Sequence, residues 1–231
     1  MKKTVHLFLI MAALLAVTAL SQSCQKSEIE QYTNAIVTVI PPQSGTTISV
    51  MLDENTVAYP VNYSGNDLGT KEQRALITFR EPKGNEAINF SSEGPQIFIA
   101  AFKPILTKQL AENLGEEQNA QSYGQDPVEI VNDWTTLAED GYMNICFRTW
   151  WGGTATHLVN MVYTPEPVNP YCVTFYHDRM DDAANEINDG IVAFSLDGLP
   201  DTQGQTVDLV VKWMSYTGQK QASFKYRTRS R

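Results

Sequence analysis

Residues 206–216 read TVDLVVKWMSY, and this stretch decides the fold of the C-terminal half of the chain. Its apolar side chains occupy every second position, at Val207, Leu209, Val211 and Trp213. Alternation with a period of two is typical of a β-strand that buries one face and leaves the other to solvent. The stretch therefore predicts a strand in a sheet whose one side packs against a core.

Five further stretches of the same kind surround it and are separated by clusters of Gly, Pro, Asn and Asp. They are GYMNICFRTWW (141–151), THLVNMVYT (156–164), YCVTFYH (171–177), IVAFSLD (191–197) and ASFKYRT (222–228). Many short strands joined by turns are the pattern of an antiparallel β-sandwich. We therefore predict an Ig-like β-sandwich over residues 126–231. No alternation of strands with helices appears there, which excludes a Rossmann-like or TIM-barrel fold.

The region before the sandwich is also rich in β-signals. We expect strands at 35–40, 47–52, 56–61, 74–80, 87–90 and 96–102, separated by turn residues. Short strands at this spacing predict an OB-fold-like small barrel over residues 35–110. Leu106, Leu110 and Leu114 then follow at helical spacing before Gly115, which predicts one short helix ending at that glycine. Residues 111–125 are predicted to be a linker, so the chain as a whole is expected to be all-β.

The N-terminus has the features of a secretory signal. Lys2 and Lys3 precede an apolar run from Leu7 to Leu20, and the sequence LSQSC ends at Cys24. The run is too short to span a bilayer, which needs about 20 apolar residues. LSQSC resembles the lipobox of bacterial lipoproteins, so we predict a signal peptide over 1–23, lipid attachment at Cys24 and a tether over 24–34. The alternatives are ordinary signal-peptidase cleavage with a free Cys24, or an uncleaved anchor.

A lipidated cysteine determines where the protein would be found. Three acyl chains exceed the two signals needed for stable attachment to a membrane. The resemblance to the lipobox of Gram-negative bacteria implies that this membrane is the bacterial outer membrane. Whether the protein faces the periplasm or the cell surface stays open. The full chain of 231 residues has a net charge of -9, and loss of residues 1–23 with their two lysines makes it -11. Such a charge argues against binding nucleic acid through its phosphates.

Several short motifs together resemble the NigD-like lipoproteins. They are PILTK at 104–108, YGQDPVEI at 123–130, DGYMNICFRT at 140–149, THLVNMVY at 156–163 and FYHDRMDD at 175–182. The resemblance covers essentially the whole mature chain and implies an N-terminal OB domain followed by a β-sandwich. Because the family name derives from a bacteriocin-associated operon, it also implies an immunity-type role. The chain departs from the family pattern at His177-Asp178, where His-Asn is more usual, and at the loop WWGGT.

The sequence offers no recognisable catalytic or metal motif. It contains neither the G-x-S-x-G elbow of hydrolases nor the HExxH or CxxC spacing of zinc sites. His157 and His177 alternate with apolar residues, which favours hydrogen-bonded structural roles. The acid-rich stretch 178–189 is expected to be a solvated loop, with weak calcium binding as the alternative. We therefore predict no catalytic residues, no metal and no cofactor.

Two residue pairs are candidates for other roles. Cys146 and Cys172 could form a disulfide in an oxidising envelope, or stay as two buried thiols. Trp150 and Trp151 could stack on a sugar ring or anchor a protein interface. If the strand runs through both tryptophans, one of them must face the core.

These observations leave three classes of function. The favoured class is a non-enzymatic envelope lipoprotein that binds a bacteriocin or another envelope protein. The alternative is a glycan-binding surface lipoprotein, which Trp150 and Trp151 would serve together with the oligosaccharide binding known for OB folds. A hydrolase comes third, because 26 acidic residues supply many carboxylate pairs by chance.

Overall fold

Five strands of the N-terminal region close into a barrel in the computed structural model, which describes residues 30–87 and 94–229. The strands follow the order β1-β2-β3-β5-β4, with a parallel pair between β3 and β5. Their bounds are Thr33–Ile40 (β1), Ser49–Met51 (β2), Val57–Pro60 (β3), Gln73–Arg80 (β4) and Gln96–Pro104 (β5). A short 3-10 helix, η1, spans Gly84–Glu86. The predicted OB-like barrel is confirmed.

Alternation along the barrel strands explains its core. Val37 and Val39 on β1, Val50 on β2 and Ile77 on β4 are all fully buried and belong to one apolar cluster. The predicted signal peptide, Cys24 and most of the tether lie outside the described residues. The same holds for most of the strand expected at 87–90.

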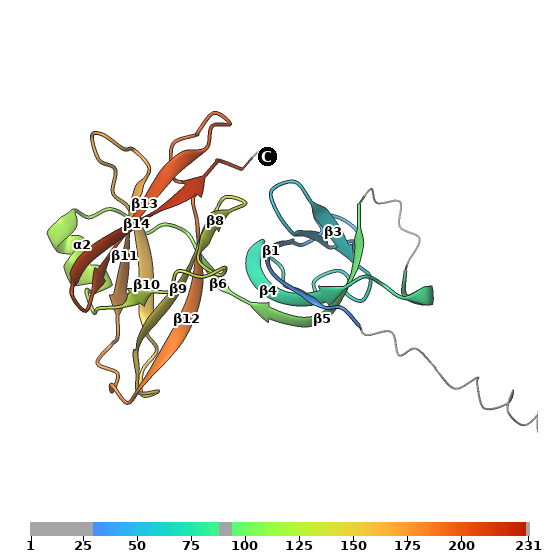
Figure 1. Cartoon of the computed structure of the whole chain (residues 1–231), viewed down its shortest axis with the longest axis horizontal. Helices are drawn as coiled ribbons and strands as arrows, with labels where there is room; N and C mark the ends of the chain where they lie inside the picture. The colour runs from blue at the N-terminus through green and yellow to red at the C-terminus, as the bar shows by residue number, and fades with distance from the viewer. Residues whose placement is uncertain (1–29, 88–93, 230–231) are drawn as a thin grey trace, which may run out of the picture. The chain divides into compact units, whose positions relative to one another are not determined.

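The C-terminal region is a sandwich of two sheets, as predicted. One sheet has four strands in the order β10-β11-β13-β14: Leu158–Tyr163, Cys172–Asp178, Val207–Ser215 and Gly218–Tyr226. The other has the order β6-β12-β9-β7: Leu106–Lys108, Glu186–Ser195, Tyr142–Trp151 and Glu129–Ile130, with β8 (Leu137–Glu139) also paired to β9. Figure 1 shows the two sheets with the helix α2 (Glu116–Tyr123) beside them.

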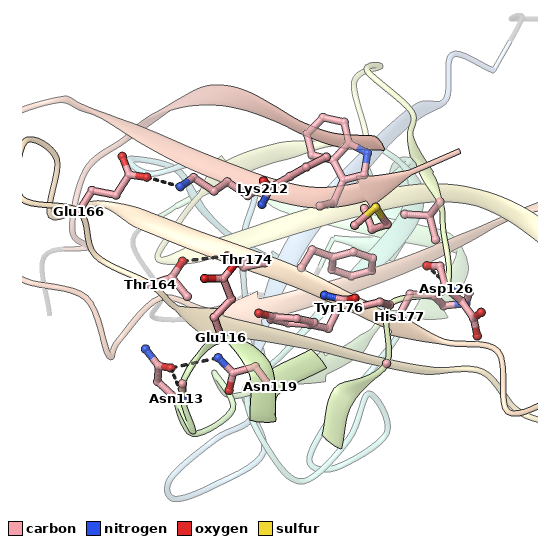
Figure 2. Close-up of a pocket in the computed structure, with 18 of the residues that line it drawn as sticks. Asn113, Glu116, Asn119, Asp126, Thr164, Glu166, Thr174, Tyr176, His177 and Lys212 are labelled. Atoms are coloured by element: carbon pink, nitrogen blue, oxygen red, sulfur yellow. Dashed lines mark hydrogen bonds and ion pairs between the residues drawn. The ribbon is translucent and has the colours of Figure 1, made fainter. Parts of the chain in front are cut away.

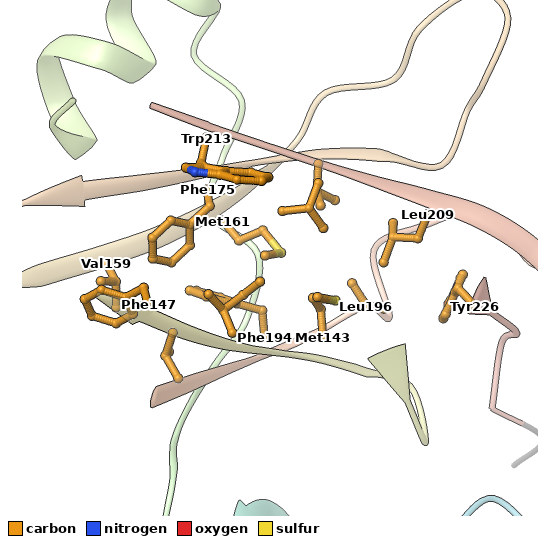
Figure 3. Packing of buried hydrophobic residues seen from close by; sticks show 14 of the residues in the cluster. Met143, Phe147, Val159, Met161, Phe175, Phe194, Leu196, Leu209, Trp213 and Tyr226 are labelled. Atoms are coloured by element: carbon orange, nitrogen blue, oxygen red, sulfur yellow. The ribbon is translucent and has the colours of Figure 1, made fainter. Parts of the chain in front are cut away.

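The inner faces of the two sheets meet in the main core. Figure 3 shows Trp213, Phe175 and Met161 of the four-stranded sheet packed toward Phe147 and Phe194 of the other. The alternation that predicted the strand at 206–216 is the reason, because Leu209 and Val211 on β13 are fully buried in this cluster. Burial of so many large apolar side chains is the main force that holds the sheets together.

Not all strand pairs are antiparallel. β11 pairs with β13 in parallel, and β6 pairs with β12 in parallel. The first pair arises because the chain leaves β11, forms β12 in the opposite sheet and returns beside β11 as β13. Two successive crossings between the sheets restore the original strand direction.

The helix predicted before Gly115 is wrong. Leu106–Lys108 forms β6, and the helix α2 begins after the glycine, at Glu116–Tyr123. Gly115 is its N-cap, with a φ of 91° that favours glycine. Pairing of Leu106 with Val192 overrides the helical spacing of the leucines. β6 thus belongs to the sandwich, although its residues fall within the range predicted for the barrel.

A buried arginine joins the barrel to the sandwich. Arg74 of β4 is fully buried and donates to Thr38 Oγ1 at 2.8 Å within the barrel. Across the junction it pairs with Glu139 Oε2 at 3.0 Å and donates to Asn144 Oδ1 at 3.3 Å. A small apolar cluster of Ile36, Ile105 and Ala193 lies at the same junction. Within the described part of the chain, no helix has the length and apolar character needed to cross a membrane.

Candidate functional site

A groove of about 510 Å³ lies on the outer face of the four-stranded sheet. Strand alternation forms its floor: Phe175 and Trp213 face the core, so their neighbours Thr174, Tyr176 and Lys212 face outward. Figure 2 shows these outward side chains together, with the start of α2 opposite them. The groove therefore lies where the polar face of a regular sheet is left without a covering layer.

The wall on the helix side is fixed by asparagine hydrogen bonds. Asn119, which is buried, accepts from Leu114 N at 2.8 Å and donates to Asn113 Oδ1 at 3.0 Å. Asn113 in turn donates to the Tyr163 carbonyl oxygen at 2.9 Å, which ties this wall to β10. These contacts hold the groove open in one shape, so a ligand would not have to order the wall on binding.

The groove is lined mostly by polar groups, and its charged side chains are three acids and one lysine. Glu166 forms an ion pair with Lys212, and Thr164 and Thr174 share a hydrogen bond of 2.9 Å between their hydroxyl oxygens. Glu116 adds an exposed carboxylate from the first turn of α2. Burial raises the pKa of Tyr176, so its phenol is neutral and available as a hydrogen-bonding group at neutral pH. Such a surface suits a ligand with many hydrogen-bonding groups.

One end of the groove is supported by two buried histidines. His177, which lines the groove, has Nε2 2.9 Å from His157 Nδ1 and Nδ1 3.2 Å from the carbonyl oxygen of Asp126. His157 Nε2 lies 3.2 Å from Asp182 Oδ2. Burial lowers the pKa of His177. The structural, hydrogen-bonded roles predicted for both histidines agree with this arrangement.

Asp182 anchors the loop that follows the two tryptophans at the end of β9. Its carboxylate accepts from the Thr154 hydroxyl and from the backbone N–H groups of Gly152 at 2.6 Å and Gly153 at 3.0 Å. These hydrogen bonds, led by that of Thr154, hold the pKa of Asp182 well below its usual range. The acid-rich stretch 178–189 is thus not simply a solvated loop, because its central aspartate is buried and fully engaged.

The two tryptophans have different surroundings, as the strand alternation required. Trp151 packs against the core, and its ring stacks on His157 with centroids 3.9 Å apart and planes 7° apart. Its indole N–H donates to the Asn188 carbonyl oxygen at 2.9 Å. Trp150 is 38% exposed and lies directly across from Ile187 of β12. Of these two tryptophans, only Trp150 therefore leaves a ring face open to solvent.

The disulfide considered for Cys146 and Cys172 is not formed, and both thiols are free and buried. The neighbours of Cys146 along β9, Ile145 and Phe147, face the core, so Cys146 faces the outside of the five-stranded sheet. The neighbour of Cys172, Val173, likewise faces the core from the other sheet. The two sulfur atoms thus point to opposite sides of the sandwich, and no small backbone shift could join them.

The described ranges 30–87 and 94–229 contain no group of three His, Cys, Asp or Glu side chains placed to hold a metal ion. The groove residues Thr174, Tyr176 and Lys212 were not among the sequence candidates. The sequence does place these residues on the polar, outward face of their strands, because they alternate with apolar residues. It does not indicate which of the outward faces lies beside α2.

Residues 111–226 match the family model of the NigD-like C-terminal beta sandwich domain, a range that includes α2 and the whole groove. A candidate toxin-related protein from Parabacteroides distasonis is 35% identical, with a TM-score of 0.71 over 86% of this chain and 94% of that one. The chain belongs to the NigD-like family. The resemblance noted in the sequence is thereby confirmed.

More distant members of this fold have also been solved. A NigD-like immunity protein from Bacteroides caccae is 16% identical, with a TM-score of 0.60 over 87% of this chain and 99% of that one. A candidate lipoprotein from Bacteroides fragilis is 11% identical, with a TM-score of 0.55 over the same shares of the two chains. At these identities the likeness concerns the fold alone. No protein of curated function matches the chain.

Proposed function

We propose that this NigD-like chain is a non-enzymatic binding protein of the bacterial cell envelope, tethered to the outer membrane through a lipid on Cys24. Its ligand is a polypeptide, and its role is of the immunity type: it captures a peptide toxin before the toxin reaches its target. The observation that carries the proposal is the preformed groove of about 510 Å³ within the domain that defines the family.

The chemistry of the groove favours binding over catalysis. Its Glu166 carboxylate is already paired with Lys212, and its one histidine, His177, has both ring nitrogens engaged. Neither group is arranged as a base beside a nucleophile. Hydroxyl, amide and carboxylate groups spread along an open floor instead match the repeated N–H and C=O groups of a peptide.

The proposal is tested in a bacterial strain from which this gene is deleted and which is then sensitive to a bacteriocin made by its own species. A deletion strain is complemented with the wild-type gene, with a Thr174→Arg variant or with a Ser223→Arg variant, and survival is measured against bacteriocin concentration. Thr174→Arg fills the groove floor, whereas Ser223 is an exposed residue of β14 that does not line the groove. We expect the wild type and Ser223→Arg to protect and Thr174→Arg to fail. Equal protection by both variants would reject the groove as the site.

A glycan is the second candidate ligand, because the groove walls carry the amides of Gln125 and Gln219 besides the hydroxyls of its floor. Neither tryptophan lines the groove: Trp150 lies on the five-stranded sheet, opposite to the groove, and the Trp151 ring is stacked on His157. A glycan array probed with residues 25–231 distinguishes the two ligands. Binding to a defined oligosaccharide that Thr174→Arg abolishes would replace the peptide by a glycan, and an array without hits agrees with the peptide.

A further inference from the structure

The strand β12 has one edge that is only partly paired. On one side it pairs with β9 along its whole length, from Glu186 opposite Trp151 to Ser195 opposite Tyr142. On the other side β6 covers only Val192–Phe194. Within the described part of the chain, no strand pairs with that edge over Glu186–Gly190.

An uncovered edge of this length presents backbone groups for pairing. Along a strand, about half of the N–H and C=O groups point to each side, so the five residues offer donors and acceptors in a row of roughly 17 Å. Natural edge strands are usually guarded by charged side chains, above all lysine, or by proline or a bulge. The sequence of 186–190 is EINDG, without proline, and its register with β9 has no bulge. Its guards are the carboxylates of Glu186 and Asp189, which repel an acidic strand but not a basic one.

The side chains beside this edge add an apolar contact. Ile187 is 52% exposed and lies directly opposite Trp150, itself 38% exposed, so the two form one apolar pad at the end of the five-stranded sheet. Next on the same face is the ion pair between Arg148 and Asp189, with Nε and Oδ1 2.7 Å apart. A strand added at the edge would place alternate side chains on this pad.

We propose that an extended, cationic segment of a partner polypeptide adds to β12 at Glu186–Gly190. Charge decides the nature of the occupant. Glu186 and Asp189 put two carboxylates on this short edge, one on each face of the strand. Glu186 is exposed, and the Asp189 side chain keeps 40% of its surface open beside its ion-pair partner Arg148. A second copy would bring another chain of net charge -9 against the same acidic edge, which disfavours self-pairing. The site lies on the sheet opposite to the groove and does not depend on the function proposed for it.

Hydrogen exchange followed by NMR tests this directly on residues 25–231. The probe is the peptide Lys-Val-Thr-Val-Lys-Val-Thr-Val-Lys, and its counterpart has Glu in place of each Lys. We expect the basic peptide to slow exchange of outward-facing amides within 187–190 by at least about tenfold, and the acidic peptide to have no effect. Ile187→Lys should abolish the protection, Glu186→Lys should weaken it, and Leu158→Lys, at a similarly exposed residue of the other sheet, should preserve it.

Three results would overturn the proposal. The first is unchanged exchange within 187–190 at saturating peptide. The second is equal protection by the acidic and basic peptides, because charge would then not select the occupant. The third is a concentration-dependent dimer, seen by sedimentation, that Ile187→Lys dissociates, because the edge would then belong to a second copy. Since none of these measurements involves Thr174, failure here leaves the groove proposal untouched.

Discussion

His157 Nδ1 lies 2.9 Å from His177 Nε2, which places these two rings at the centre of a buried chain of three hydrogen bonds. The chain runs from the Asp182 carboxylate through both rings to the Asp126 carbonyl oxygen. Both ends can only accept, so three N–H protons are needed for the three contacts. Two neutral imidazoles carry only two. All three hydrogen bonds can form together only when one of the two rings carries a second N–H.

The carbonyl oxygen of Asp126 fixes the tautomer of His177. Burial lowers the pKa of His177, so its ring is neutral at pH 7, and its one proton must be on Nδ1 to donate to that carbonyl oxygen. Nε2 is then left as the acceptor in the contact with His157. Nitrogen-15 NMR at pH 7 should show His177 as the Nδ1–H tautomer. A proton on Nε2 in place of Nδ1 would contradict this assignment.

Acid should weaken the fold through Asp182. Its pKa is lowered in the folded state, so its carboxylate stabilises the fold above the ordinary aspartate pKa of about 3.9, and the contribution is lost as pH falls below that value. Asp182→Asn should therefore lower Tm by several degrees at pH 7, and the difference from wild type should shrink toward pH 3. Asp181→Asn, at the exposed neighbour, is the matched control and should leave Tm unchanged at both pH values.

The sequence predicted the strands well because alternation reports burial directly. Val207, Leu209 and Val211 mark the inner face of β13 without any knowledge of the partner sheet. The strand at Glu186–Gly190 escaped prediction, because its residues are mostly polar and are held by pairing with β9 instead of by burial. The helix was misplaced for a related reason: contacts distant in sequence hold Leu106 in a strand.

The candidate site was harder to predict from the sequence than the fold. The groove exists because α2 covers only part of the outer face of the four-stranded sheet, the face that carries Thr174 and Tyr176. Its position depends on Asn113 and Asn119, whose hydrogen bonds to distant backbone have no sequence signature. The role of Trp151 was likewise hidden until the structure placed His157 against it.

Removal of the buried arginine should uncouple the barrel from the sandwich. Arg74→Met leaves the partly buried Glu139 without its partner, and loss of one member of a fully buried pair costs about 3–5 kcal/mol, which sets the upper limit here. Arg148→Met, at an exposed ion pair, should cost less than about 1 kcal/mol. Urea unfolding of both variants checks this comparison. Equal losses would mean that the junction does not depend on Arg74.

Reducing agents should not affect stability. In residues 25–231 the only two cysteines are Cys146 and Cys172, and they face opposite sides of the sandwich. A thiol assay in denaturant should count two free thiols, and dithiothreitol should leave Tm unchanged. A mass lower by two hydrogen atoms, together with a Tm that falls on reduction, would show that the sheets are arranged differently.

Photo-crosslinking from the groove floor tests the central claim most directly. A photoreactive phenylalanine analogue replaces Thr174 in the full-length protein, or Ser223 as the matched control, and cells are irradiated during exposure to the bacteriocin against which the gene protects. We predict a crosslinked product with the combined mass of the two polypeptides from position 174 and none from position 223. Crosslinking from position 223 alone, or from neither position in cells that remain protected, would contradict binding in the groove.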